Sequence, residues 1–405
     1  MDLSRRSRYA INPIQEEDAV AYSLMKSGKK VIKLNRGDPA IYFKTPKYVV
    51  DAYVKALREG KTFYADPIGV KELREAVSKR YKSMYNIKVN PDNVIVTQGL
   101  SEAIIFLNAT LINEGEKAVI FKPYYTQYIP DLEIFGGKAV LERYDERINW
   151  NIDIDSLEKS IKKDFKKSNK IKYMLITNPN NPTGTVLDRK VLSDIVEIAK
   201  NHDIMLISDE IYDEIVFNGA KFTSISKLAK GVPHIILNGG SKDFAATGFR
   251  VGFVVVPEED KVSKAVSSKL GDFAKIRLSG NTPAQYAIAE ALNKEREHKD
   301  AVRKMVSAIG KRAGLVSRLV NESEFMDAVE PKGAFYVFPK LDMKKLTLKN
   351  DTEFVDKLLK EEYVQLTRGS GFGENNHVRI VALATENILE DAMQRIERFC
   401  RRHSR

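Results

Sequence analysis

The stretch NGGSKDFAATGFRVGF, residues 238–253, follows an apolar run over 235–237 and carries one lysine, Lys242, with Arg250 eight residues further along. A short apolar run ended by glycines predicts a buried β-strand, so Lys242 is expected just beyond a strand end. Taken alone, a lysine in such a place is a surface residue, because lysines are rarely buried. The segments that follow the other strands decide whether Lys242 is more than that.

Apolar, β-rich runs alternate with helix-period segments through the middle of the chain. Strands are predicted over 93–97, 117–121, 138–144, 172–177, 203–208, 234–238 and 250–256, and helices over 101–112, 154–163, 188–201 and 224–228. This alternation predicts an α/β fold with a mostly parallel, doubly wound sheet and helices on both faces.

The texture of the sequence changes from about residue 285 onward. A long charged amphipathic segment over 285–320 is followed by strand-like runs at 333–338 and 377–383 and by a helix at 352–362. A chain of 405 residues is also too long for one small core. We therefore expect a large domain over 45–285 and a smaller α/β domain built from 1–44 and 286–405.

The composition argues against several classes of protein. The net charge of +11 comes from interspersed charges of both signs, with short basic blocks only at 162–170 and 400–405. That pattern is typical of an ion-rich surface and does not indicate a nucleic-acid-binding protein. No run approaches the length of a membrane-spanning helix, and the first fifteen residues lack the apolar stretch of a signal peptide, so we expect a cytoplasmic protein without a membrane segment.

Cysteine and histidine usage excludes metal and disulfide frameworks. Cys400 is the single cysteine, so no internal disulfide can form. The five histidines are scattered, without an HExxH motif or a pair on one helical face. We expect no metal site.

Four polar segments follow predicted strands. They are QGLSEAI after 93–97, NPNNPTG after 172–177, DEIYDEIVF after 203–208 and GGSKDFAATGFR after 234–238. Each has an ordinary reading by itself: a serine N-cap, a turn, an aspartate N-cap and a surface lysine. In a doubly wound sheet, however, all of them meet at one edge, where ligands bind.

Together these segments offer complementary chemistry. A lysine amine can bind an aldehyde covalently, an aspartate can pair with a ring nitrogen, and an Asn/Tyr pair can donate hydrogen bonds. A glycine and serine that open a helix leave N–H groups free for a phosphate. The combination predicts a site for pyridoxal 5′-phosphate.

An ordered set of motifs extends this pattern over almost the whole chain. It comprises LNRGDP (34–39), YADPIGVKELREAV (64–77), VTQGLSEA (96–103), NPNNPTG (178–184), SDEIYDEI (208–215), NGGSKDFAATGFRVG (238–252), NTPAQ (281–285), PKGAFYVF (331–338), GSGFG (369–373) and VRI (378–380). With these motifs the chain resembles the class I/II, fold-type I aminotransferases, and most closely the archaeal-type alanine aminotransferases. The resemblance implies a pyridoxal-phosphate-dependent enzyme that moves the α-amino group of an L-amino acid to a 2-oxo acid.

The resemblance implies the catalytic roles. Lys242 carries the cofactor covalently and moves the proton of the substrate Cα, which suits a lysine whose pKa is lowered. Asp209 pairs with the pyridine nitrogen and keeps it protonated.

Further residues are expected around the cofactor ring. Asn181 and Tyr212 match the family residues that hydrogen-bond the ring 3′-oxygen, and the bond from Asn181 to Pro182 is a candidate cis peptide. Tyr125 matches the aromatic residue that stacks on the ring, in preference to its neighbour Tyr124. The alternative for either tyrosine is packing at an interface.

For the phosphate, the resemblance points to the Leu100 and Ser101 backbone, the Ser101 hydroxyl, Ser241 and Arg250. Tyr64 would come from a second subunit, so the resemblance implies a homodimer with shared active sites.

The chain departs from the family pattern at two positions. Gly239 stands where many members have a serine, which leaves the share of Ser241 in phosphate binding open. Arg36 stands where relatives often have a small or apolar residue, and this leaves the local substrate contact open.

The substrate is expected to bind through its α-carboxylate to Arg379, with the Gly37 backbone and the Asn181 side chain as further partners. Arg277 stands six residues before Pro283, like the arginine that the partner subunit contributes to bind a distal carboxylate in aspartate-specific members, and we expect Arg277 to help bind glutamate and 2-oxoglutarate. A structural ion pair is the alternative for Arg277.

The expected reaction transfers the amino group of alanine to a 2-oxo acid, with glutamate and 2-oxoglutarate as the partner pair. An aspartate or aromatic aminotransferase, or a pyridoxal-phosphate-dependent lyase on the same fold, remains the alternative, because the cofactor residues are common to all of them.

Overall fold

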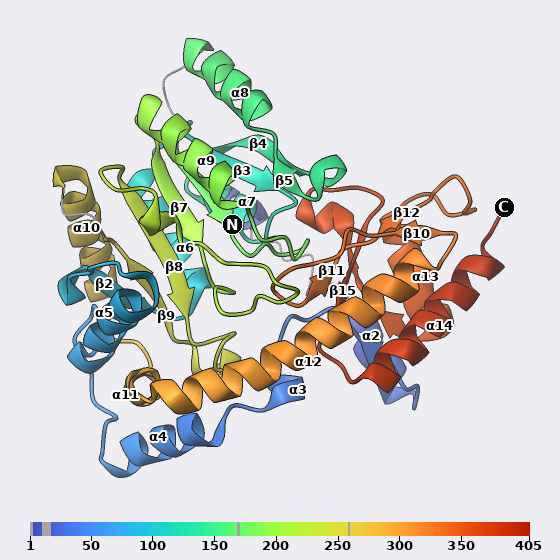
Figure 1. Cartoon of the computed structure of the whole chain (residues 1–405), viewed down its shortest axis with the longest axis horizontal. Coiled ribbons are helices and arrows are strands. Elements are labelled where there is room, and N and C mark those ends of the chain that lie inside the picture. Colours follow the sequence, from blue (N-terminus) through green and yellow to red (C-terminus); the bar gives the residue numbers. More distant parts are fainter. Residues whose placement is uncertain (1–2, 10–17, 168–170, 258–259) are drawn as a thin grey trace.

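The computed structural model describes residues 3–9, 18–167, 171–257 and 260–405 (Figure 1). Its centre is an eight-stranded sheet in the order β2-β9-β8-β7-β6-β3-β4-β5. The strands are β2 (Val94–Thr97), β3 (Lys117–Lys122), β4 (Lys138–Asp145), β5 (Asn151–Ile152), β6 (Ile171–Thr177), β7 (Met205–Asp209), β8 (His234–Gly239) and β9 (Gly252–Val255).

The sheet is mostly parallel, as predicted. β8, β7, β6, β3 and β4 pair parallel to one another, whereas β9 pairs antiparallel to both β8 and β2. β2 consequently points the same way as β8, and the carboxyl ends of β2, β6, β7 and β8 lie at one edge. Each of the seven predicted strands is present, and the two-residue β5 is the one sheet strand that the sequence pattern did not predict.

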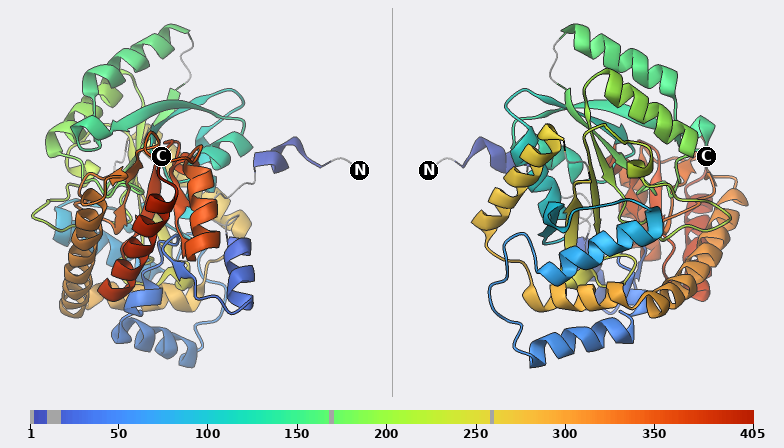
Figure 2. Two further views of the ribbon diagram at one scale, coloured as in Figure 1. Left: turned by 90° about the vertical axis from the view of Figure 1, so that its right-hand side faces the viewer. Right: turned by 60° about the vertical axis from the view of Figure 1, so that its left-hand side comes forward.

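The central strands β2, β9, β8, β7, β6 and β3 are largely buried on both faces because their side chains alternate between two apolar clusters, whereas β4 is partly exposed. Along β6, Tyr173 and Leu175 belong to one cluster and Met174 and Ile176 to the other. The first face is covered by α6 (Leu100–Leu111), α7 (Tyr128–Ile134) and α10 (Lys261–Arg277); the second is covered by α5 (Lys71–Tyr85), α8 (Ile154–Lys167), α9 (Arg189–Asn201) and α11 (Thr282–Asn293). α4 (Lys47–Arg58) lies alongside α11 (Figure 2).

The predicted helices differ from the structure in two places. The segment 224–228 forms only a short 3-10 turn, η4 (Ile225–Lys227). The amphipathic segment 285–320 is divided between α11 and α12 (Glu295–Asn321), because Lys294 leaves the helical conformation with φ −89 and ψ 62. This break lets α12 leave the sheet and run to the other end of the molecule (Figure 1).

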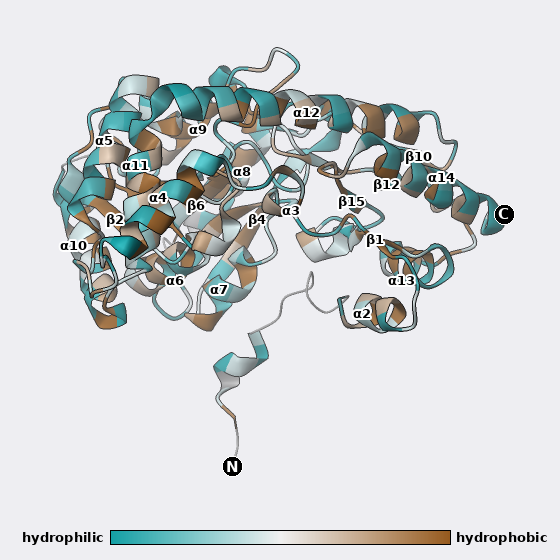
Figure 3. Cartoon of the chain, turned by 90° about the horizontal axis from the view of Figure 1, so that it is seen from below, coloured by the Kyte–Doolittle hydropathy of each residue, from teal (hydrophilic) through white to brown (hydrophobic). Residues whose placement is uncertain are grey.

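A second lobe packs against one side of α12. The buried residues of this helix recur every three or four positions, so one side faces the lobe and the charged side faces outward (Figure 3). The lobe contains α2 (Asp18–Lys26), α3 (Ala40–Phe43), α13 (Asp351–Glu362) and α14 (Glu386–Arg402), and the strands β1 (Ile32–Lys33), β10 (Met326–Asp327), β11 (Tyr336–Val337), β12 (Lys340–Leu341), β13 (Val364–Gln365), β14 (Thr367–Arg368) and β15 (Val378–Val381).

The predicted division into 45–285 and into 1–44 with 286–405 stays a proposal. It is supported by a third apolar cluster, drawn mainly from residues before 35 and after 304, with a few residues from the loops that follow β7 and β8. Residues 1–2 and 10–17 of the predicted small domain, and 168–170 of the basic block, lie outside the described residues.

The remaining elements are short 3-10 turns: η1 (Arg5–Tyr9), η2 (Pro91–Asn93), η3 (Glu146–Ile148), η5 (Thr247–Phe249) and η6 (Gly369–Phe372). Among the helices of the described part of the chain, none has the length and apolar character needed to cross a membrane.

Candidate active site

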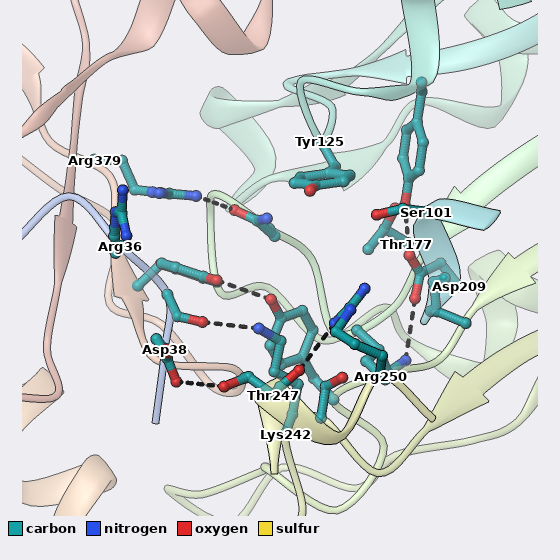
Figure 4. Close-up of a pocket in the computed structure, with 18 residues that line it drawn as sticks. Arg36, Asp38, Ser101, Tyr125, Thr177, Asp209, Lys242, Thr247, Arg250 and Arg379 are labelled. Carbon is teal, nitrogen blue, oxygen red and sulfur yellow. Dashed lines mark hydrogen bonds between the residues drawn. The ribbon is translucent and has the colours of Figure 1, made fainter. Parts of the chain in front are cut away.

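A pocket of about 380 Å³ lies at the carboxyl edge of the sheet, where the two lobes meet (Figure 4). Eleven of the predicted site residues line it: Gly37, Leu100, Ser101, Tyr125, Asn181, Asp209, Tyr212, Ser241, Lys242, Arg250 and Arg379. The pocket thus gathers segments that are up to 343 residues apart in the chain, from Arg36 to Arg379.

Lys242 projects into this pocket from the loop after β8, so the surface reading of this residue does not hold. Its Nζ donates a hydrogen bond to the Gly37 carbonyl oxygen at 2.7 Å and lies 5.9 Å from the Tyr212 ring centroid. Burial lowers the pKa of the Lys242 amine to about 8. The amine is therefore much easier to deprotonate than an exposed lysine, as a nucleophile or base requires.

Asp209 is the last residue of β7 and is buried. Its carboxylate accepts hydrogen bonds from the Tyr128 hydroxyl at 2.6 Å and from the Ile211 N–H at 3.1 Å. The second bond is the one an N-cap would make, but residues 211–214 form a turn and no helix follows. Burial raises the pKa of Asp209 to about 6, so a cation beside it would be strongly favoured.

Two predicted residues meet at the wall opposite the sheet edge. The Asn181 Oδ1 accepts a hydrogen bond from Arg379 Nη1 at 2.9 Å, and the peptide bond between Asn181 and Pro182 is cis, as predicted. The segment 178–184 is also a turn, because Asn180 Oδ1 accepts the Thr183 N–H. The segment therefore forms a turn and also places Asn181 on the pocket, while the role of Asn181 toward a cofactor stays a prediction.

The amino end of α6 and the side chain of Arg250 form a corner of the pocket that is rich in N–H donors. Gly99 precedes the helix with φ 73, and a Cβ there would lie 2.1 Å from the Arg250 guanidinium. Arg250 donates hydrogen bonds to the carbonyl oxygens of Thr247 and Gln98 at 3.0 and 3.1 Å. The guanidinium thus stands beside the N–H groups of the first turn of α6, where Ser101 also lies.

The structure explains why a glycine is needed at position 239. A Cβ at Gly239 would lie 2.6 Å from the Val251 carbonyl oxygen and 2.8 Å from the Gly252 Cα. Both atoms belong to the neighbouring backbone, which a side chain cannot displace by changing rotamer. A serine at this position would require β8 and β9 to move apart.

Arg379 lies on β15 and is 2% exposed. Its guanidinium carbon lies 4.6 Å from the Tyr336 ring centroid and 4.7 Å from that of Phe372, and its Nη2 donates to the Asn35 carbonyl oxygen at 2.5 Å. Gly37 is close by, where a Cβ would lie 2.1 Å from the Tyr336 hydroxyl. The arginine is held rigidly between two rings, as the binding of a planar carboxylate requires.

Two predicted residues lie outside the pocket of their own chain. Arg277 donates to Glu102 and to the Pro67 carbonyl oxygen, both at 2.7 Å, so the structure favours the ion-pair alternative set out above. Its use against a substrate carboxylate stays a prediction. Tyr64 is 82% exposed, and its contribution to another subunit also stays a prediction.

Several pocket residues were not predicted as site residues. Tyr128 holds Asp209, and the Tyr336 hydroxyl lies 2.8 Å from that of Tyr212. Thr247 donates to Asp38 Oδ1 at 2.8 Å, and Arg36 also lines the pocket. Two of the tyrosines lie in motifs that were recognised, since Tyr128 follows Tyr125 in YYTQY and Tyr336 lies within PKGAFYVF. Within the described ranges, no group of three or more acidic, histidine or cysteine side chains is placed to hold a metal ion.

Comparisons with known proteins agree with this fold and pocket. The family model "Aminotransferase class I and II" matches residues 29–396. The chain is 35% identical to an aspartate aminotransferase of Thermotoga maritima, over 98% of this chain and 99% of the relative. It is 32% identical to the glutamate-pyruvate aminotransferase AlaA of Haemophilus influenzae, over 96% and 94%.

Solved structures agree as well. An alanine aminotransferase from Pyrococcus furiosus superposes with a TM-score of 0.94 at 36% identity, covering 99% of this chain and 100% of that one. Fold and comparisons together define an α/β enzyme. The chain belongs to the class I and II aminotransferases, a family that depends on pyridoxal 5′-phosphate.

The residues of the pocket fit this cofactor. The buried Asp209 carboxylate suits a protonated ring nitrogen, and the Lys242 amine, with its lowered pKa, suits an aldehyde. Arg250 and Ser101 at the amino end of α6 suit a phosphate, and the Tyr125 ring supplies an aromatic wall.

Proposed function

We propose that this enzyme transfers the α-amino group of L-alanine to 2-oxoglutarate, and runs the reverse reaction, in two half-reactions. The observation that carries this proposal is the segment from Asn35 to Gly37. Arg379 donates to the carbonyl oxygen at one end, and Lys242 donates to the carbonyl oxygen at the other. The Arg379 guanidinium and the Lys242 amine are thus held by backbone groups two residues apart, at most about 7 Å of chain, which suits the carboxylate and amino group of one α-amino acid.

Each residue has a distinct task in the proposed mechanism. When bound, pyridoxal phosphate supplies an aldehyde for the amino group and a ring that withdraws electrons from the Cα–H bond. Arg379 binds the α-carboxylate and fixes the orientation of Cα. Lys242 Nζ takes the proton from Cα, for which its pKa of about 8 is well placed near neutral pH.

The remaining residues hold the charges in place. Asp209 keeps a negative charge at the end of β7, and Tyr128 orients its carboxylate. Arg250 and the first turn of α6 hold the phosphate end. Asn181 bonds to Arg379 and therefore orients the guanidinium as well as offering an amide group to the ring oxygen.

The relatives support the choice of substrate. The Pyrococcus furiosus structure is an alanine aminotransferase, and AlaA of Haemophilus influenzae acts on glutamate and pyruvate by its name. The aromatic side chains of Tyr125, Tyr212 and Tyr336 also narrow the pocket around Lys242. Other relatives are aspartate or aromatic-amino-acid aminotransferases, so these substrates are the alternatives to be tested.

We also propose a homodimer with shared active sites in the cytoplasm. The exposed side chains of Phe63 and Tyr64, with 52% and 82% of their surface accessible, offer an aromatic patch to a second subunit. In the dimer, Tyr64 would complete the phosphate corner of the partner. Light scattering of the purified protein tests whether it is a dimer. Tyr64→Phe should weaken cofactor binding while the dimer stays intact.

Single-turnover mixing of the holoenzyme with one amino acid at a time tests the reaction. Without any 2-oxo acid, L-alanine and L-glutamate should each convert the cofactor absorbance to that of the aminated cofactor, while L-aspartate should react more slowly. If none of the three converts it, the proposed substrates are wrong. Detection of an unsaturated or eliminated product would indicate a lyase instead.

A further inference from the structure

Arg36 is a pocket arginine to which the proposed mechanism gives no task. The arginines that line the pocket are Arg36, Arg250 and Arg379. Arg250 stands at the amino end of α6, and Arg379 stands between two aromatic rings as the α-carboxylate site. Arg36 lies in the segment that connects β1 to α3.

The backbone around Arg36 is fixed on both sides. The Asn35 carbonyl oxygen accepts from Arg379 and the Gly37 carbonyl oxygen accepts from Lys242. Residue 36 is therefore placed between the α-carboxylate site and the reactive amine. Figure 4 shows Arg36 and Arg379 in the same part of the pocket wall, away from Arg250. The Arg36 side chain is 44% exposed, so it borders the open side of the pocket.

One edge of the Arg36 guanidinium is held from behind. Its Nε donates to Asp18 Oδ2 at 3.1 Å, and its Nη2 bonds to the same oxygen. Asp18 itself is buried, in the first turn of α2. Among the described residues, Nη1 has no hydrogen-bond partner, so the other edge of the guanidinium is open for a ligand.

The charge of Arg36 is not cancelled by Asp18. The Asp18 carboxylate also forms an ion pair with Lys33, whose Nζ lies 3.3 Å from Oδ1. Burial raises the pKa of Asp18, but the hydrogen bonds from Arg36 and Gln365 and the charge of Lys33 outweigh it and lower the pKa overall. Asp18 thus carries one negative charge against the positive charges of Lys33 and Arg36. Asp38, which also lines the pocket, adds a negative charge that raises the pKa of Arg36, so Arg36 stays positively charged.

We propose that Arg36 determines specificity for dicarboxylic substrates by binding the distal carboxylate of glutamate or 2-oxoglutarate, while Arg379 binds the α-carboxylate. This inference rests on the proposed function. A guanidinium anchored through one edge is pre-oriented to bind a carboxylate through the other. With alanine bound, the half-exposed Arg36 stays hydrated, so a methyl group is not penalised by an unpaired buried charge.

Arg277 competes poorly for this role. Its Nη1 is committed to Glu102, and its Nη2 to the carbonyl oxygens of Pro67 and Val96 at 2.7 and 3.3 Å. Releasing it toward a substrate would leave these partners unsatisfied. Arg36, in contrast, lines the pocket, and its Nη1 has no partner among the described residues.

The test compares Arg36→Met with Lys33→Met in the holoenzyme. Each variant removes one of the two positive charges that pair with Asp18, but only Arg36 lines the pocket. In single-turnover mixing, the ratio of kcat/KM for glutamate to that for alanine should fall about 10- to 100-fold in Arg36→Met and stay close to the wild-type ratio in Lys33→Met. An unchanged ratio in Arg36→Met, or an equal fall in both variants, would overturn the proposal.

A binding measurement separates this inference from the proposed function. Glutarate and butyrate are unreactive and differ in one carboxylate, and their dissociation constants can be obtained from the cofactor absorbance. Arg36→Met should raise the dissociation constant of glutarate about tenfold or more and that of butyrate far less. Arg36→Gln, which keeps a donor for Asp18 but no charge, should behave in the same way.

The outcomes are distinguishable. If the wild-type enzyme converts neither alanine nor glutamate, the proposed function is wrong, but selective loss of glutarate binding still supports Arg36 as a dicarboxylate site. If both half-reactions occur and glutarate binds equally well to the wild type and to both Arg36 variants, the function stands and the role of Arg36 is wrong.

Discussion

The hydroxyl of Tyr128 lies 2.6 Å from Asp209 Oδ2, and both residues are buried. Tyr128 begins α7, whereas Asp209 ends β7, so the contact joins the helical layer to the edge of the sheet. The same hydroxyl lies 3.0 Å from Thr177 Oγ1, at the end of the neighbouring strand β6. This hydrogen bond favours the ionised form of Asp209 in a place where burial opposes it.

Tyr128→Phe should therefore weaken cofactor binding. Loss of a hydrogen bond to a buried charge costs about 1.5–3 kcal/mol, or roughly 10- to 100-fold in the dissociation constant. The pKa of Asp209 should rise above its value of about 6, so the acid limb of cofactor binding should move to higher pH. Titration of the apoenzyme across pH, with Tyr124→Phe as the control, measures both effects. An unchanged acid limb would contradict the role of Tyr128.

The lowered pKa of Lys242 predicts a pH profile for attachment of the cofactor. Only the neutral amine attacks an aldehyde, so the attachment rate should rise with pH up to about 8 and then level off. A free lysine side chain would keep gaining rate up to about pH 10.4. Stopped-flow mixing of apoenzyme with pyridoxal phosphate from about pH 6 to about pH 9.5 checks this. A rate that climbs steadily over the whole range would show that the Lys242 amine is not perturbed.

Gly239→Ser should destabilise the protein, although serine fits the family pattern described in the sequence analysis. The added Cβ would lie 2.6 Å from the Val251 carbonyl oxygen, and forced separation of two strands costs about 1–3 kcal/mol. Gly248→Ser is the matched control in the same loop, because a Cβ at Gly248 meets nothing within 4 Å. Thermal denaturation should show a clearly lower Tm for Gly239→Ser alone. Equal Tm values would mean that the strands adjust without cost.

Arg277→Leu should affect stability more than substrate choice. The change removes the partner of Glu102 and the donor to three carbonyl oxygens, those of Leu278, Pro67 and Val96, in a partly buried setting. We expect a lower Tm and an unchanged ratio of glutamate to alanine kcat/KM. Glu102→Gln should lower the Tm by a similar amount. A selective loss of glutamate activity in Arg277→Leu would instead support its alternative role as a substrate residue.

The sequence predicted the features that depend on local pattern. The apolar runs located all seven longer strands of the sheet, because buried strands need continuous apolar residues. Since parallel strands end at one edge of the sheet, the sequence alone predicts that the polar segments after them lie close together. Lys242, Asp209 and Asn181 were found in this way.

Features that depend on tertiary distances were not predictable. Whether a tyrosine hydroxyl such as that of Tyr128 reaches a carboxylate depends on where a helix lies over the sheet. The break at Lys294 interrupts a pattern that reads as one amphipathic helix, since its apolar spacing continues on both sides. The reason for Gly239 lies in the backbone of a strand that follows it, and the sequence by itself shows only that a serine is missing.

The antiparallel strand β9 has a consequence for how this enzyme can change through evolution. Gly239 and Gly252 face each other in register, so both ends of the loop that carries Lys242 and Arg250 are pinned to paired strands. Substitutions within the loop leave that frame intact. A single inserted or deleted residue cannot be absorbed there, because it must either shift Arg250 away from α6 or turn the side chains of β9 onto the wrong face of the sheet. Length, more than identity, should therefore be the constrained property of this loop.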